Sequence, residues 1–98
     1  MSRENLSIKE IFDSALQHYQ NGNLKEAEIL FKKVLELMPN HFSSTFLLGT
    51  LSAQIKKYQA AKKFLEVAIE INPNNAEVRN NLGNVFYELD QHQEAESC

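Results

Sequence analysis

The chain has 98 residues, of which 43% are hydrophobic and 23% charged, as in an ordinary soluble globular protein. A net charge of −3 at pH 7 argues against a general attraction to nucleic acid or to an anionic membrane. The single cysteine, Cys98, excludes an internal disulfide framework, and the sequence contains neither an apolar signal core nor an apolar run of about 18 residues. We therefore expect one small cytoplasmic domain with no nucleic-acid or membrane partner.

The first third of the sequence predicts two helices. Ser7 and Glu10 form the S-x-x-E pattern of a capping box, and apolar residues then recur with helical spacing, which predicts a helix over 8–20. Gly22, in "NGN", suits the left-handed conformation that ends a helix. A second apolar pattern predicts a helix over 24–37, and the proline after it would stop that helix.

This arrangement recurs at an offset of 34 residues, which aligns Pro39 with Pro73 and Gly49 with Gly83. The expected organisation is a lead-in over 1–7, a first repeat over 8–41, a second over 42–75, and a third over 76–98 that is truncated in its second helix. We expect further helices over 42–54, 58–71 and 75–88, and a sixth that begins near 92. Lys56 replaces Gly22 at the second turn, so it is expected to adopt a positive φ at a cost of roughly 1 kcal/mol.

Small residues recur at matching positions of the helices. They are Ala15, Gly49 and Gly83 in the first helices and Ala27, Ala61 and Ala95 in the second. Small side chains at facing positions let two antiparallel helices approach closely, so we expect burial at the crossings. On this basis Gly83→Leu is predicted to overpack the third hairpin. One hairpin cannot bury its apolar face alone, so the repeats must stack.

A 34-residue helix-turn-helix with Leu-Gly in its first helix, Ala and an aromatic or Leu in its second, and a closing Pro resembles the tetratricopeptide repeat (TPR) family, from about Ile8 to Cys98. "NPNNAEVRNNLGN" is also similar to repeats in the superhelix of O-linked N-acetylglucosamine transferases. The resemblance implies an all-α, right-handed superhelical stack of about two and a half antiparallel hairpins. The chain departs from the family pattern at Ile11, Thr45 and Arg79 (Trp favoured), at His18, Ser52 and Phe86 (Tyr favoured), and at Ser14 and Ala15 (Leu-Gly favoured).

The sequence gives no sign of a catalytic or metal site. His18, His41 and His92 fall in different repeats, and the glycines form no phosphate-binding loop. Paired lysines alternate with glutamates, which favours a solvated face over a basic patch. We therefore expect no enzyme activity, no cofactor and no metal.

The first helices of stacked hairpins line the concave side of the superhelix, where a peptide groove is expected. Candidate groove residues are Phe12, Leu16, Tyr19, Phe46, Thr50, Asn80, Asn81, Asn84 and Tyr87. The groove would change from apolar in the first repeat to amide-rich in the third, where the asparagines could pair with the backbone of an extended peptide. Alternatively, the apolar members are core residues or are covered by the N-terminal segment.

The resemblance suggests two binding modes. A carboxylate clamp requires basic side chains in the groove, but the corresponding positions hold Phe12, Leu16, Leu47, Glu77 and Asn81, so we expect no clamp. Asn81, directly before Leu-Gly, matches the asparagine ladder of the glycosyltransferase superhelix. The earlier repeats have Asp13 and Leu47 at that position, which leaves one rung at most.

The third repeat raises the question of what covers its apolar face. We expect Val78, Leu82, Val85, Phe86 and Leu89 to lack part of their cover and to promote association with a second copy, by two-fold pairing or by exchange of the last helix. The leading interpretation is a non-enzymatic scaffold that binds a protein or peptide partner in its groove. The alternatives are an N-terminal segment of a larger glycosyltransferase- or sulfotransferase-like enzyme, and a self-assembling TPR module.

Overall fold

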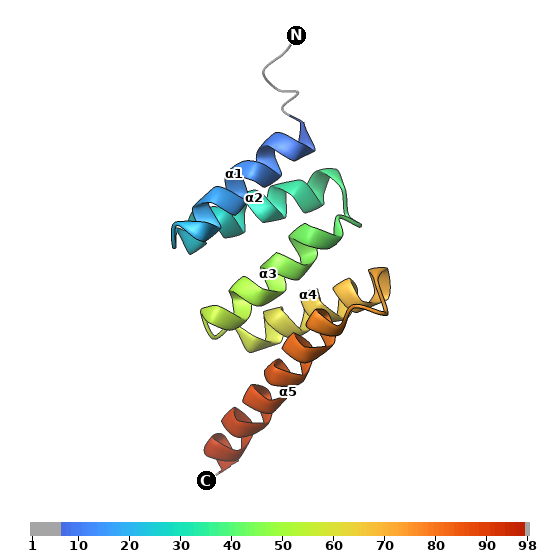
Figure 1. Ribbon diagram of the computed structural model, residues 1–98. Helices are drawn as coiled ribbons and strands as arrows, with labels where there is room; N and C mark the ends of the chain where they lie inside the picture. The colour runs from blue at the N-terminus through green and yellow to red at the C-terminus, as the bar shows by residue number, and fades with distance from the viewer. Residues whose placement is uncertain (1–6, 98) are drawn as a thin grey trace.

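The structure, a computed structural model, describes residues 7–97 and the side chains of residues 7–91. Its five helices are α1 (Ile8–Gln20), α2 (Leu24–Leu37), α3 (Phe42–Gln54), α4 (Tyr58–Ile71) and α5 (Ala76–Ser97), and this part of the chain has no strand. α1 with α2 and α3 with α4 form two hairpins that stack on each other, and α5 packs mainly on α4 (Figure 1). The predicted fold class, an all-α stack of TPR-type hairpins, is confirmed.

The first four helices have the predicted bounds, but the prediction for the third repeat was wrong in one respect. α5 continues without a turn to Ser97, so residues 92–97 extend it and do not begin a sixth helix. Asp90 occupies the repeat position of Gly22 and Lys56, and the residues that follow it include the good helix formers Gln, Glu and Ala. No glycine or proline interrupts the helix there. Ala95 lies beyond the described side chains.

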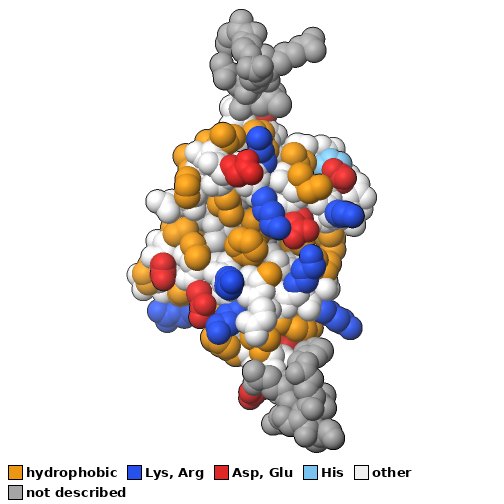
Figure 2. All heavy atoms as spheres, turned by 180° about the vertical axis from the view of Figure 1, so that it is seen from behind, with side chains coloured by type: hydrophobic (Ala, Val, Ile, Leu, Met, Phe, Trp, Pro, Cys, Tyr) orange, Lys and Arg blue, Asp and Glu red, His pale blue; other side chains and the backbone are white. Residues whose placement is uncertain are grey.

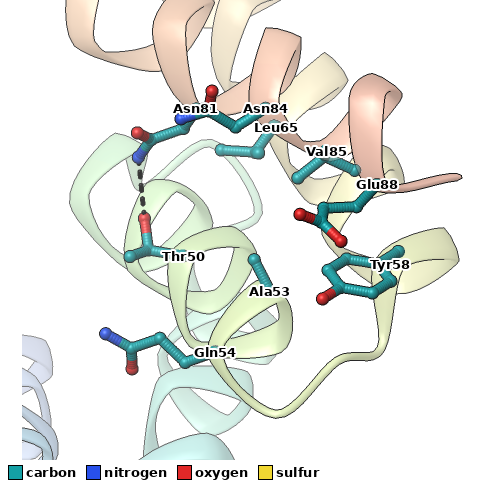
Figure 3. A pocket seen from close by; sticks show the side chains of 9 residues that line it. All are labelled: Thr50, Ala53, Gln54, Tyr58, Leu65, Asn81, Asn84, Val85 and Glu88. Atoms are coloured by element: carbon teal, nitrogen blue, oxygen red, sulfur yellow. Dashed lines mark hydrogen bonds between the residues drawn. The ribbon is translucent and has the colours of Figure 1, made fainter. Parts of the chain in front are cut away.

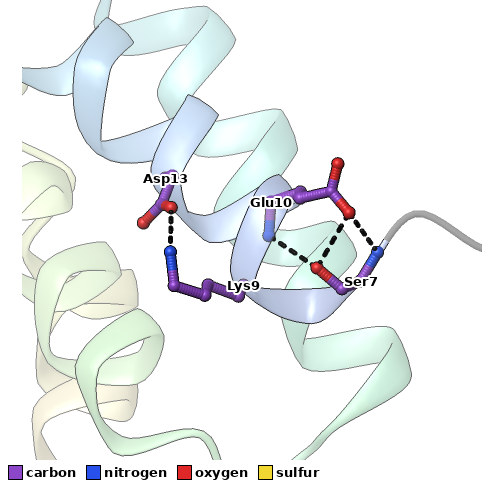
Figure 4. Close-up of polar contacts among 4 residues, drawn as sticks. All are labelled: Ser7, Lys9, Glu10 and Asp13. Atoms are coloured by element: carbon purple, nitrogen blue, oxygen red, sulfur yellow. Dashed lines mark hydrogen bonds and ion pairs between the residues drawn. The ribbon is translucent and has the colours of Figure 1, made fainter.

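The predicted capping box at the start of α1 is present (Figure 4). The Glu10 backbone N–H donates to Ser7 Oγ at 3.1 Å, and the Ser7 N–H donates to Glu10 Oε1 at 3.2 Å. In the same first turn, Lys9 Nζ lies 2.9 Å from Oδ2 of Asp13, and the hydrogen bond and the negative charge of Asp13 raise the pKa of Lys9. Both partners are exposed, so the capping box fixes the helix start more than the ion pair does.

The two interhelical turns at Gly22 and Lys56 have the same backbone geometry. φ is +83° at Gly22 and +65° at Lys56, as predicted. A side chain is disfavoured in this left-handed region because its Cβ crowds the backbone.

Lys56→Gly should therefore stabilise the protein by about 0.5–1 kcal/mol, because it removes the backbone strain at this position. Glycine also raises the entropy of the unfolded chain, which offsets part of this gain. Lys57→Gly is the matched control, since Lys57 has a φ of −91°. Urea denaturation of both variants measures the difference. A Lys56→Gly variant no more stable than Lys57→Gly would contradict the strain argument.

Two apolar clusters hold the stack together. The first surrounds Phe31, which is fully buried and has the rings of Phe12 and Tyr19 at centroid distances of 5.8 and 6.3 Å. The second joins α3, α4 and α5 through Leu65 and Val85. Burial is thus concentrated at the helix crossings, as expected for hairpins that cannot be stable singly.

The small residues behave as predicted at most positions and differently at one. Ala15, Ala27, Ala61 and Gly49 are buried. A Cβ on Gly49 would lie 2.7 Å from Leu65 Cγ, so α3 and α4 approach closely there. Gly83 is exposed and has no neighbour within 4 Å of such a Cβ. Its predicted burial was wrong, because no second helix of the third repeat folds back over it, and the overpacking expected for Gly83→Leu has no structural basis.

Pro39 and Pro73 are exposed and follow α2 and α4, in the turns that lead to the next repeat. Within residues 7–97, none of the helices combines the length and the apolar character needed to span a bilayer.

Candidate functional site

A pocket lies where α3, α4 and α5 meet, and we call it the groove pocket (Figure 3). It has a volume of about 280 Å³ and opens to solvent. Its lining residues are Thr50, Ala53 and Gln54 from α3, Tyr58 and Leu65 from α4, and Asn81, Asn84, Val85 and Glu88 from α5. Apolar side chains thus lie beside amides, two hydroxyls and one carboxylate, as in many ligand sites.

One side-chain hydrogen bond joins α3 and α5 at the groove pocket. Asn81 Nδ2 donates to Thr50 Oγ1 at 3.2 Å, and the Thr50 hydroxyl donates to the Phe46 carbonyl at 3.1 Å (Figure 3). Asn81 and Thr50 are each half-buried. Because its amide nitrogen is engaged with Thr50, Asn81 offers its side-chain oxygen as the acceptor for a ligand N–H.

The opposite end of the groove pocket carries its charge. Glu88 is the one charged residue among the nine that line it, and it lies beside Tyr58. Burial raises the pKa of the Tyr58 phenol, and the negative charge of Glu88 and a hydrogen bond to it raise this pKa further. Tyr58 thus stays protonated at neutral pH, and the pocket as a whole disfavours a second carboxylate.

Of the predicted groove residues, the structure brings Thr50, Asn81 and Asn84 together in this pocket. Asn80 and Tyr87 are exposed on α5, and Tyr87 is 63% exposed. Neither lines the pocket.

The apolar candidates lie elsewhere. Phe12, Leu16 and Tyr19 are half-buried against the first core cluster, and Phe12 also contacts the His41 ring at a centroid distance of 5.0 Å. Phe46 is half-buried, stacks on Phe42 and packs against the second cluster. Core packing therefore accounts for much of their surface, as the alternative interpretation anticipated. Their membership of one concave surface stays a prediction.

Sequence reasoning did not identify Tyr58 and Leu65 as pocket residues. Both belong to the second helix of a repeat, whereas the groove was expected from first helices alone. Tyr58 is the first residue of α4, and its ring reaches Glu88 on α5, the first helix of the next repeat. Its position at the start of the second helix was the signal in the sequence that could have identified it.

The predicted self-association residues divide into two groups. Val78 and Val85 are buried, at 0% and 2% exposure, and Leu82 and Leu89 are half-buried against the second cluster. The expectation that they lack cover is wrong for the two valines, because α4 packs on them. Phe86 is 47% exposed, with Lys62 Nζ 5.8 Å from its ring centroid.

Charges of both signs are intermingled over the rear face of the molecule, and no large patch of one sign is visible there (Figure 2). Within the described residues, no three His, Cys, Asp or Glu side chains come together as metal ligands would.

Comparison with known proteins places this geometry in context. The model of the family described as Anaphase-promoting complex, cyclosome, subunit 3 matches residues 14–98. The UDP-N-acetylglucosamine–peptide N-acetylglucosaminyltransferase of Caenorhabditis elegans is 32% identical over 91% of this chain and 8% of its own length. The chain spans no more than 10% of the three curated relatives compared with it.

Solved structures show the same fold. MamA from Desulfovibrio magneticus RS-1 superimposes with a TM-score of 0.84 and 27% identity, over 90% of this chain and 50% of that one. The first TPR of Spaghetti (RPAP3), bound to an HSP90 peptide, gives a TM-score of 0.80 at 16% identity, over 92% of this chain and 71% of that one. At that low identity the second likeness concerns the fold alone.

Proposed function

Because the chain belongs to the TPR-type family described as Anaphase-promoting complex, cyclosome, subunit 3, we propose that it is a non-enzymatic scaffold that binds an extended peptide or a partner helix in its groove pocket. TPR domains bind protein or peptide partners, so the class of partner follows from the family. The observation that carries the proposal is the groove pocket itself, where apolar and amide groups of three helices converge.

The lining suggests how such a peptide is held. Ala53 is half-buried and supplies apolar surface for one side chain of the ligand, and the buried Leu65 and Val85 form the floor of the pocket behind it. Asn84 is exposed at the rim, and together with the Asn81 oxygen it can pair with main-chain N–H and C=O groups. Such contacts bind an extended backbone without reading its sequence.

The charge of the pocket gives a preference against acidic peptides. Glu88 disfavours a ligand carboxylate, and the lining contributes neither Lys nor Arg to attract one. The proposed mode is therefore different from a carboxylate clamp. A ligand with a basic side chain near Glu88 is favoured.

Selection of a random peptide library on the immobilised chain tests this function. The enriched peptides should be apolar and basic, and they should bind Asn84→Trp, which fills the exposed rim, at least about tenfold more weakly than the wild type. Glu88→Lys should move the preference toward acidic peptides, whereas Glu70→Lys, at an exposed residue of α4 outside the pocket, should not. Peptides that bind all four proteins equally would refute the proposal.

A second candidate function is that of a TPR segment in a larger enzyme of the glycosyltransferase or sulfotransferase type. The likeness to the Caenorhabditis elegans transferase, over 91% of this chain and 8% of that enzyme, favours it. The reading frame after Cys98 decides between the two, because a catalytic domain there would support this candidate.

Self-association through the third repeat is a further part of the proposal. The exposed ring of Phe86 supports it, although the buried valines beside it do not contribute.

A further inference from the structure

Four exposed residues of α5 lie on one stripe of the helix. Arg79, Gly83, Phe86 and Asp90 follow one another at intervals of four, three and four residues, the spacing at which side chains share one helix face. We call them the α5 stripe. It flanks the face of α5 that carries Val78 and Val85, which belong to the second core cluster.

The position of Asp90 corresponds to the exposed Lys56 in the preceding repeat, and the other three stripe positions are covered there. In α3 they are Thr45, Gly49 and Ser52, which are all buried, and Leu65 of α4 lies directly over the glycine. On the α5 stripe, Gly83 has open space where its Cβ would be. Within the described residues, the stripe is therefore a helix-packing surface that no helix covers.

The stripe is complementary to itself in shape. If two copies of α5 lie antiparallel about a two-fold axis that passes between residues 84 and 85, Gly83 of each copy faces Phe86 of the other. An exposed ring then enters the gap left by a missing side chain, as a knob enters a hole. Lys62 Nζ, 5.8 Å from the Phe86 ring centroid, covers part of this ring from α4 and leaves it 47% exposed.

The stripe is also complementary to itself in charge. The same axis places Arg79 of each copy opposite Asp90 of the other, and a two-fold axis makes every such contact twice. Arg79 Nη2 donates to the Pro73 carbonyl at 2.7 Å, which leaves other N–H groups of the guanidinium for a carboxylate.

We infer that the α5 stripe is a homodimer interface on which a second copy of this chain binds antiparallel, with Phe86 on Gly83 and Arg79 beside Asp90. This inference deepens the self-association included in the proposed function. The α5 stripe and the groove pocket lie on different faces of α5, so the dimer interface and peptide binding can be refuted independently.

Sedimentation of the 98-residue chain from about 10 µM to 1 mM tests the interface, because a single helix pair buries little surface and binds weakly. The wild type should dimerise with rising concentration. Arg79→Asp or Asp90→Arg alone should weaken the dimer about tenfold or more, since each places like charges opposite each other twice. The double variant should recover wild-type association within about threefold. Glu77→Arg, on another face of α5, should leave it unchanged.

The inference would be overturned by a wild type that stays monomeric at 1 mM, by single reversals that leave the dimer intact, or by a double variant that does not recover association. An exchanged last helix would give a dimer that is lost when residues 92–98 are removed and is insensitive to both reversals, which also overturns it. Far-UV circular dichroism of each variant confirms that these exposed substitutions leave the fold intact. Asn84→Trp, which blocks the groove pocket, should dimerise like the wild type.

Discussion

Phe31→Ala should lower the free energy of unfolding by about 3–5 kcal/mol, the largest effect of any substitution considered. Phe31 is fully buried in the first core cluster, where two further aromatic rings pack on it, and its removal leaves a cavity between α1 and α2. A domain of this size has a thin core and a total stability of roughly 5–15 kcal/mol, so much of the variant would be unfolded at moderate temperature. Guanidinium denaturation followed by circular dichroism measures the change.

Phe86→Ala provides the matched control, since it removes the same side chain from a 47% exposed position. It should cost less than about 1 kcal/mol at concentrations where the protein is monomeric. Equal losses of unfolding free energy for the two variants would contradict the assignment of Phe31 to the core and of Phe86 to the surface.

Alanine at Gly49 and at Gly83 should have opposite effects, although the two glycines occupy the same repeat position. At Gly49 the new Cβ would lie 2.7 and 2.8 Å from two carbons of Leu65, so α3 and α4 must move apart, which costs about 1–3 kcal/mol. At Gly83 the Cβ meets nothing, and alanine's higher helix propensity should add about 0.5–1 kcal/mol of stability. Thermal and urea unfolding of both variants test this pair.

If both alanine variants were destabilised to a similar extent at concentrations where the protein is monomeric, a helix of the same chain would have to cover Gly83. Residues 92–97 would then fold back as the sixth helix that the sequence predicts, and the continuous α5 would be wrong.

The sequence was sufficient to predict the two complete hairpins, because local signals and the repeat agree there. Helical apolar spacing, a capping box at Ser7, and turns at Gly22 and Lys56 each predict the same boundaries. The positive φ at Lys56 was predictable for the same reason, since it aligns with a glycine.

The structure of the third repeat was not predictable in this way, because the repeat pattern assumes that the same helix packs on equivalent positions in every repeat. Gly83 aligns with Gly49, but α4 packs on Gly49 whereas no corresponding second helix packs on Gly83. A helix ends where a cap or a breaker stops it, and the turn position at Asp90 contains neither.

The candidate site was predictable in part. Thr50, Asn81 and Asn84 follow from the register of first helices, and they meet in the groove pocket. Tyr58 and Leu65 do not follow from it, because their place depends on how closely α4 approaches α5. The half-buried state of Phe12 and Phe46 also depends on packing between repeats, which periodicity within one helix does not report.

Nuclear magnetic resonance mapping of a bound peptide tests the central claim most directly. Peptides enriched on the immobilised chain would be titrated into the isotope-labelled protein at concentrations where it is monomeric. The account predicts the largest shift changes at the groove pocket, around Thr50, Asn84 and Glu88, and much smaller ones at the Phe86 side chain on the α5 stripe. Shifts centred on the α5 stripe, or spread over both faces without a centre, would contradict it.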